Sequence, residues 1–153
     1  MTVLLGIDLG DRRIGVATAD TDTGSVRPLL TLRRGTPAAD AATLRRISRE
    51  RRVDELVVGL PLHRDGRESE QSRRTRAWVE EVGSLVGLPV TLRDERLTSQ
   101  SAEGRMGLAP RGRSGGAPSA RARHAWRARI DREAAADILQ RELDARTTSE
   151  VTT

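Results

Sequence analysis

The stretch from Leu4 to Gly10 is a short apolar run that contains a single carboxylate, Asp8. Because side chains alternate along a strand, the odd-numbered residues from 3 to 9 share one apolar side, whereas the even-numbered residues 4, 6, 8 and 10 share the other. A run with apolar side chains on both sides is typical of a central strand that is covered on both faces. We therefore expect the rest of the chain to be organised around this strand.

Asp8 is the unusual residue of the run. An ionised carboxylate inside an apolar strand is costly unless a partner compensates its charge. Gly6 and Gly10 have no side chains, so another backbone or a ligand can come close to Asp8, and a bound cation would supply the compensation. The alternative is that Asp8 only begins a turn through Gly10 and Asp11. The local sequence leaves both interpretations open.

Length and composition predict a single cytosolic domain. The chain has 153 residues, which is enough for a substantial core, and we expect one domain over residues 1–146 followed by a disordered polar tail over 147–153. Trp78 and Trp126 are the only aromatic residues, so aliphatic side chains must fill the core. No run of about 18 apolar residues, no signal peptide and no cysteine is visible, which argues against a membrane span, secretion and a disulfide framework.

Positive charge is concentrated in one segment. The net charge is +5, and all 27 basic residues are arginine. Residues 104–129 contain seven of these arginines and no acid, which leaves 20 arginines against 22 acids elsewhere. Such a concentration is typical of proteins that bind phosphate-rich partners. Glycine and proline within residues 107–120 predict a flexible basic loop, so a solvated loop without a ligand is the alternative.

The order of predicted elements indicates a mixed α/β sheet. Three strands come first, over residues 2–9, 13–19 and 26–32, and Pro28 suggests an exposed position for the third. The later elements are a helix from Thr36-Pro37, a strand over 55–60, a helix over 69–86, a strand over 89–94, a short helix over 99–106 and a helix over 130–146. Strands that alternate with helices pair in parallel, so we predict a five-stranded sheet of three antiparallel strands followed by parallel ones.

Three acidic places are candidates for one site. Besides Asp8, Asp94 and Glu95 end the fifth predicted strand, where ligands of open α/β sheets gather. Asp131 begins the last predicted helix and shares a face with the apolar residues three, four and seven positions later, which would pack on the sheet. Strand alternation favours Asp94 over Glu95 but does not decide between them, because the strand ends there. An ordinary helix N-cap is the alternative for Asp131.

Crowded carboxylates repel one another, and a divalent cation relieves that repulsion. Mg²⁺ and Mn²⁺ prefer oxygen ligands, and two such ions can activate a water molecule and stabilise the leaving oxygen of a phosphodiester. The basic segment would then hold the nucleic-acid backbone. Other sites have less support, because His63 and His124 are isolated, cysteine is absent and a Walker-type phosphate loop would need a lysine.

Four motifs of the chain match one known family. They are G-I-D-L-G-D-R-R-I-G-V-A at 6–17, V-V-G-L-P-L-H-R-D-G at 57–66, D-E-R-L-T-S at 94–99 and I-D-R-E-A-A-A-D-I-L-Q at 130–140. Together they span nearly the whole chain and resemble the YqgF/RuvX family, whose members are described as candidate pre-16S rRNA nucleases and as candidate Holliday junction resolvases. The resemblance implies an RNase H-like fold, a bacterial cytoplasmic location and phosphodiester hydrolysis with Mg²⁺ or Mn²⁺, two ions being expected.

The family pattern also implies roles for individual residues. Asp8, Glu95 and Asp131 would be the catalytic metal ligands, with Asp94 as a further candidate, so the resemblance favours Glu95 where alternation did not decide. The segment 104–129 is longer and richer in glycine than the basic stretch of the family. The arginines that we expect to contact nucleic acid are Arg12, Arg96, Arg105, Arg111, Arg113, Arg121, Arg123, Arg127 and Arg129.

The leading hypothesis is a metal-dependent endonuclease that trims the 5′ end of a pre-16S rRNA, a substrate that the resemblance alone implies. Cleavage of a DNA junction is a close variant, because a basic loop reads phosphate and not sugar. A kinase or ATPase of the actin-like superfamily is a second class, but 153 residues supply only about one lobe of such a protein. A non-catalytic RNA-binding assembly factor is a third. The sequence is compatible with a monomer or a homodimer.

Overall fold

The computed structural model describes residues 1–63, 65–94, 112 and 115–152, with side chains described up to residue 149. Its elements in chain order are β1 (Val3–Leu9), β2 (Arg13–Asp20), β3 (Val26–Arg33), α1 (Pro37–Glu50), β4 (Glu55–Leu60), α2 (Glu70–Val86), β5 (Val90–Asp94) and α4 (Ala120–Thr152). The short helix expected over 99–106 and most of the loop expected over 107–120 lie outside the described residues.

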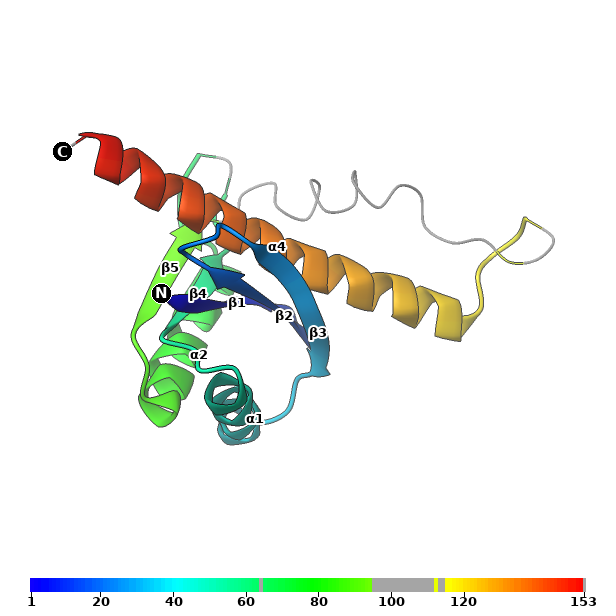
Figure 1. Ribbon diagram of the computed structural model, residues 1–153. Coiled ribbons are helices and arrows are strands. Elements are labelled where there is room, and N and C mark those ends of the chain that lie inside the picture. Colours follow the sequence, from blue (N-terminus) through cyan, green and yellow to red (C-terminus); the bar gives the residue numbers. More distant parts are fainter. Residues whose placement is uncertain (64, 95–111, 113–114, 153) are drawn as a thin grey trace.

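One sheet, in the order β3-β2-β1-β4-β5, forms the centre of the molecule (Figure 1). β1 pairs antiparallel with β2, and β2 with β3, whereas β1–β4 and β4–β5 are parallel. This confirms the predicted mixed sheet and the central place of β1. Pro28 lies in β3, an edge strand, next to Leu29, which the register shift between Val16 and Ala17 leaves without a pairing partner, and such a position tolerates a residue without an N–H group.

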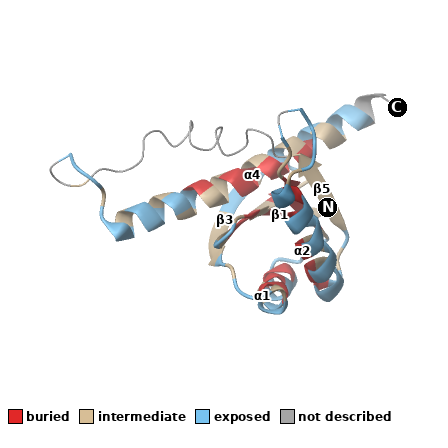
Figure 2. Ribbon diagram, turned by 180° about the vertical axis from the view of Figure 1, so that it is seen from behind, coloured by how far each residue is buried: buried red, intermediate tan, exposed pale blue. Residues whose placement is uncertain are grey.

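Helices cover the two faces of the sheet with separate apolar clusters. α1 and α2 pack on one face, where Leu5, Ile7 and Trp78 belong to the larger cluster. α4 crosses the other face, and its residues Ile138 and Leu139 pack there. Figures 1 and 2 show α4 extending well beyond the sheet, with its buried residues confined to the part that lies on the strands. The alternation predicted for β1 therefore divides its side chains between two helical layers.

The helix boundaries follow from capping residues. Thr36 accepts a hydrogen bond from the Ala39 N–H at 3.1 Å and precedes Pro37, the first residue of α1. Ser69 and Ser72 form a capping box at the start of α2. Gly87 ends α2 in the left-handed region at φ 78°, as expected for a C-cap glycine.

The last helix differs from its prediction at both ends. It begins at Ala120, where the Ser119 hydroxyl accepts from the Ala122 N–H at 3.1 Å, and not at residue 130. It also continues through Thr152 in place of the polar tail, with the Thr147 hydroxyl donating to the Leu143 carbonyl at 3.0 Å. Asp131 consequently lies inside the helix, so the N-cap alternative is wrong. None of the helices in the described part of the chain, α4 included, is long and apolar enough to cross a membrane.

Candidate active site

Gly15 of β2 is the point at which Asp8 and Asp131 come to the same face of the sheet. Asp8 of β1 is paired directly with Gly15, and paired residues of antiparallel strands project to the same side. α4 lies against Gly15 so closely that an added Cβ atom would overlap the carbonyl oxygen of Asp131. α4 makes a similar approach at Gly6, where an added Cβ atom would lie 2.9 Å from the Ala135 carbonyl oxygen. The glycines thus let a helix backbone approach β1 beside Asp8.

The parallel strands bring the end of β5 to the same edge of the sheet. Ile7, Val58 and Leu92 form one row across β1, β4 and β5, so Asp8 lies one residue beyond this row and Asp94 two residues beyond it. The two aspartates are separated by two strand spacings, roughly 10 Å. Ile7 and Leu92 belong to the side of α1 and α2, so alternation directs Asp94 to that side and away from Asp8. Glu95 lies outside the described residues.

Arg13 holds the carboxylate of Asp131. Its Nε donates a hydrogen bond to Asp131 Oδ2 at 2.7 Å, and both side chains are partly buried, with exposures of 27% and 22%. Arg13 follows the alternation of β2 to the same face as Gly15, which explains why it reaches α4. A guanidinium placed in this way offsets the charge of Asp131 and fixes the orientation of its carboxylate.

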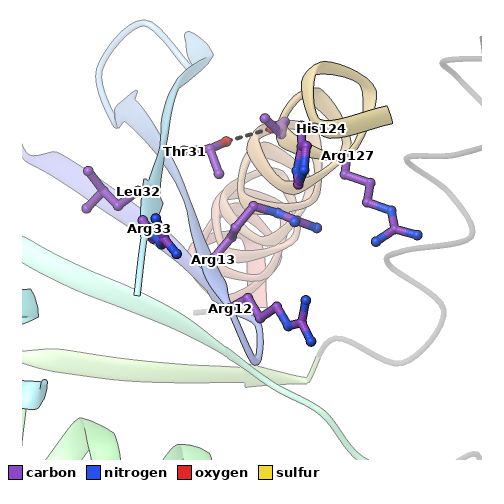
Figure 3. Close-up of a pocket in the computed structure, with 8 residues that line it drawn as sticks. Arg12, Arg13, Thr31, Leu32, Arg33, His124 and Arg127 are labelled. Atoms are coloured by element: carbon purple, nitrogen blue, oxygen red, sulfur yellow. Dashed lines mark hydrogen bonds between the residues drawn. The ribbon is translucent and has the colours of Figure 1, made fainter. Parts of the chain in front are cut away.

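Two adjoining cavities open beside this ion pair. The first, of about 420 Å³, is lined by Gly10, Asp11, Arg12, Arg13, Arg127 and Asp131. The second, of about 500 Å³, is lined by Arg12, Arg13, Thr31, Leu32, Arg33, His124, Arg127 and Ala128 (Figure 3). The two cavities share Arg12, Arg13 and Arg127. The carboxylate of Asp131 in the first cavity therefore lies next to a second cavity that is strongly cationic.

A second charged group anchors the other half of α4. Glu142, whose side chain is 5% exposed, accepts from Arg93 Nε of β5 at 2.8 Å and from Arg146 Nε at 3.0 Å. Arg146 also donates to Glu55 of β4 at 2.8 Å, and Thr91 donates to the same carboxylate at 2.6 Å. Burial raises the pKa of Glu55, but the hydrogen bonds from Arg146 and Thr91 and the charge of Arg146 outweigh it, so the pKa lies below its ordinary value. These contacts fix the position of α4 on the sheet.

A family model described as "RuvX: Holliday junction resolvase" matches residues 2–145. The chain belongs to the RuvX family. A protein of Anaeromyxobacter sp. (strain Fw109-5), named "Putative pre-16S rRNA nuclease", is 46% identical over 142 residues, which cover 93% of this chain and 96% of the relative. A protein of Thermosynechococcus vestitus with the same name is 43% identical over 146 residues, covering 95% of this chain and 90% of the relative.

Solved structures support the same fold for this RuvX-family chain. T. thermophilus RuvC, solved in complex with a Holliday junction substrate, matches with a TM-score of 0.55 and 16% identity over 97% of both chains. The large terminase nuclease of thermophilic phage G20c matches with a TM-score of 0.50 and 16% identity, covering 88% of this chain and 80% of the other. These structures confirm the expected RNase H-like fold, whereas the family model and the nuclease-named relatives confirm the resemblance and the expected nuclease class.

The structure brings together only some of the predicted site residues. Asp8 and Asp131 share a face, and Arg12 and Arg127 line the cavities beside them. Arg121, Arg123 and Arg129 lie on the same part of α4 but line neither cavity. The predicted residues that lie outside the described part of the chain are Glu95, Arg96, Arg105, Arg111 and Arg113.

Three residues with basic side chains that line these cavities were absent from the sequence-based set of nucleic-acid contacts: Arg13, Arg33 and His124. Strand alternation held a signal for Arg13, which lies two residues before Gly15 and therefore on the same face of β2. The sequence holds no comparable signal for Arg33 or His124, because their proximity depends on where α4 crosses the edge strand β3.

Proposed function

We propose that this RuvX-family protein is a metal-dependent endonuclease whose catalytic carboxylates are Asp8, Glu95 and Asp131. The observation that carries the proposal is the crossing of α4 at Gly15, which brings Asp8 and Asp131 to one face although they lie at opposite ends of the sequence. The carboxyl ends of β1 and β5 lie at the same edge of the sheet, so Glu95, one residue after β5, is the third candidate.

The donor set suits magnesium or manganese. Carboxylate oxygens are the ligands that these ions prefer, and Arg13 occupies only Oδ2 of Asp131 within the described residues, which leaves the second oxygen for a cation. Within the described part of the chain, no three acidic or histidine residues cluster as a metal site, and the third proposed ligand lies outside it. When bound, two ions would activate water and stabilise the leaving oxygen. Arg13 would keep the Asp131 carboxylate oriented, and Arg12 and Arg127 would hold the nucleic-acid backbone.

We further propose that the substrate is the 5′ end of pre-16S rRNA and that the protein acts in the cytoplasm. The names of relatives that are 43–46% identical over nearly their full length support this substrate. Cleavage of a four-way DNA junction is the second candidate, and the description of the matching family supports it. The arginines beside Asp131 do not discriminate between the two, because phosphate contacts carry no information about the sugar.

The nuclease proposal is tested with Asp8→Asn. Purified wild-type protein should cleave a precursor-rRNA fragment when Mg²⁺ or Mn²⁺ is added, and Asp8→Asn should lose at least about a thousandfold in rate while its thermal melt stays cooperative. Glu81→Gln, an exposed acid on α2, is the matched control and should cleave like the wild type. Undiminished cleavage by Asp8→Asn would refute the proposal.

The choice of substrate needs a separate comparison. A precursor-rRNA fragment and a four-way DNA junction of similar length should be offered to the same preparation at equal metal concentration, and cleavage rates should be compared below saturation. We expect the RNA to be cleaved faster. Preferential cleavage of the junction, lost in Asp8→Asn, would assign the protein to the resolvase alternative.

A further inference from the structure

The surface beside the carboxylates carries three arginines whose charge nothing in the described chain neutralises. Arg12 lies in the β1–β2 turn, Arg33 ends β3 and Arg127 lies in the first part of α4, and all three are exposed. They line one cavity of about 500 Å³ in which His124 joins them. Within the described residues no ion pair involves any of the three, and no acid lines this cavity. Figure 3 shows Arg12, Arg33 and Arg127 coming from three different elements and lying around Arg13.

The backbone under these arginines is held in place by hydrogen bonds between the three segments. The Thr31 hydroxyl of β3 donates to the Ala128 carbonyl of α4 at 2.6 Å. Arg34 Nη1 donates to the Gly10 carbonyl at 2.9 Å, and the Arg34 N–H donates to the Arg12 carbonyl at 2.9 Å. Because the strand, the turn and the helix are fixed to one another, their cations are positioned before any ligand arrives, which lowers the entropic cost of binding.

We propose that Arg12, Arg33 and Arg127, with His124, form a pocket that binds one backbone phosphate of a nucleic-acid strand next to the phosphodiester that is cleaved. This inference rests on the proposed nuclease function, because it is the cavity bordered by Asp131 that adjoins the pocket and shares Arg12 and Arg127 with it. Arg13 forms an ion pair with Asp131, so the pocket's remaining basic side chains are the ones that would contact the nucleic acid.

The chemistry of the pocket selects a phosphodiester and not a base. Guanidinium groups make paired, charge-assisted hydrogen bonds with phosphate oxygens, and several of them around one phosphate favour that group strongly. Contacts of this kind fix the register of a strand without reading its sequence. The pocket therefore determines which linkage lies at the carboxylates, at a fixed number of nucleotides from the bound phosphate.

The test measures binding in the Asp8→Asn background, so that it does not depend on cleavage. Arg33→Ala/Arg127→Ala should bind a short fluorescent RNA about tenfold more weakly at about 0.1 M salt. A plot of the logarithm of the association constant against the logarithm of the salt concentration has a negative slope, and this slope should become shallower by about 1 in the double variant. The matched control, Arg45→Ala/Arg73→Ala, removes two exposed arginines from α1 and α2 and should bind nearly as tightly as the parent.

A second measurement changes the RNA and locates the bound phosphate along the strand. An RNA series in which one linkage at a time is replaced by an uncharged methylphosphonate should reveal a single linkage whose neutralisation costs most affinity, and that penalty should vanish in Arg33→Ala/Arg127→Ala. Equal penalties at all linkages, or a double variant that binds like its control, would overturn the pocket.

The two proposals fail in different ways. Binding that depends on these arginines, without metal-dependent cleavage by the wild type, would support the pocket and refute the nuclease. Cleavage by the wild type together with full binding by Arg33→Ala/Arg127→Ala would do the reverse. A wild-type protein that binds no nucleic acid would overturn both.

Discussion

At the scale of single residues, Gly15 lets α4 approach the sheet closely enough for the proposed site to form. It is the pairing partner of Asp8 and the residue on which α4 rests at Asp131. The missing side chain is what allows the backbone of a helix to touch the backbone of a strand at this point. The arrangement of Asp8 and Asp131, which the proposed catalysis requires, thus depends on Gly15, a residue that has no side chain of its own.

Gly15→Ala should therefore damage both stability and activity. The new methyl group would collide with the Asp131 carbonyl, and α4 would have to shift, at a cost of about 2 kcal/mol or more in the free energy of unfolding. Urea denaturation and cleavage rate measure the two effects. Gly35→Ala is the control, because its added Cβ atom would lie 3.5 Å from the nearest described atom, an ordinary contact. Equal stability of the two variants would contradict this account of Gly15.

The sequence predicted some of these residues and not others for physical reasons. Asp8 was recognisable because a charge in an apolar strand needs an explanation, and the face of Asp131 followed from helical periodicity. Strand alternation placed Asp94 on the apolar side of β5, but this side faces α1 and α2 and not α4, so alternation favoured the residue that the structure directs away from Asp8. The pocket around Arg33 and His124 was not predictable, because it depends on where α4 crosses β3.

At the scale of elements, strands and capped helices were predictable and the long helix was not. β4 has the bounds that the sequence predicted, Glu55–Leu60, and α2 has both its capping box and its C-cap glycine. The first part of α4 is rich in arginine and alanine, and its apolar side is narrow, with Trp126 and Ile130 as its large residues. In the sequence this segment therefore looks like part of a basic loop. Trp126 packs with Ile130 and Ala134, which favours a structural role over stacking on a base.

The anchor of α4 makes a prediction at this scale. Glu142→Ala removes a buried carboxylate and leaves Arg93 and Arg146, each about one third exposed, without this partner. Because water can partly solvate both arginines, we expect a loss of about 2 kcal/mol, less than for a fully buried pair. Thermal or urea denaturation measures it. Asp144→Ala, which removes an exposed acid two residues after Glu142 on the same helix, should change stability much less, and an equal loss would argue against the anchor.

The same anchor should make stability depend on pH. The pKa of Glu55 is lowered in the folded state, so its contribution is present above its ordinary value of 4.5 and is lost as the pH falls through the lower folded value. Wild-type protein should be more stable than Glu55→Gln at about pH 7, and the difference should shrink at about pH 3.5. Chemical denaturation at both pH values measures this. A difference that stays constant would show that the charge of Glu55 does not contribute.

At the scale of the whole molecule, the proposals assign metal binding and nucleic-acid binding to two adjoining but separate sets of side chains. Carboxylates at the carboxyl edge of the sheet would hold the metal, whereas arginines of the turn, β3 and α4 would hold the phosphates. The family match spans residues 2–145 and therefore includes both groups.

This separation predicts that chelation uncouples the two activities. EDTA should abolish cleavage, and excess Mg²⁺ should restore it, whereas RNA affinity measured by fluorescence anisotropy should change by no more than about threefold, because the arginines supply most of it. Loss of binding on chelation, with recovery when metal is added, would instead place the metal ions between protein and strand.

The continuity of α4 has a consequence for how such a chain can evolve. Asp131 and Glu142 lie eleven residues apart on one unbroken helix, which is about three full turns, so both face the sheet. Inserting one residue between them would rotate one end by about 100° relative to the other and turn either the carboxylate or its anchor toward solvent. Substitutions can accumulate along this interval, but a lasting change in its length would have to preserve whole turns.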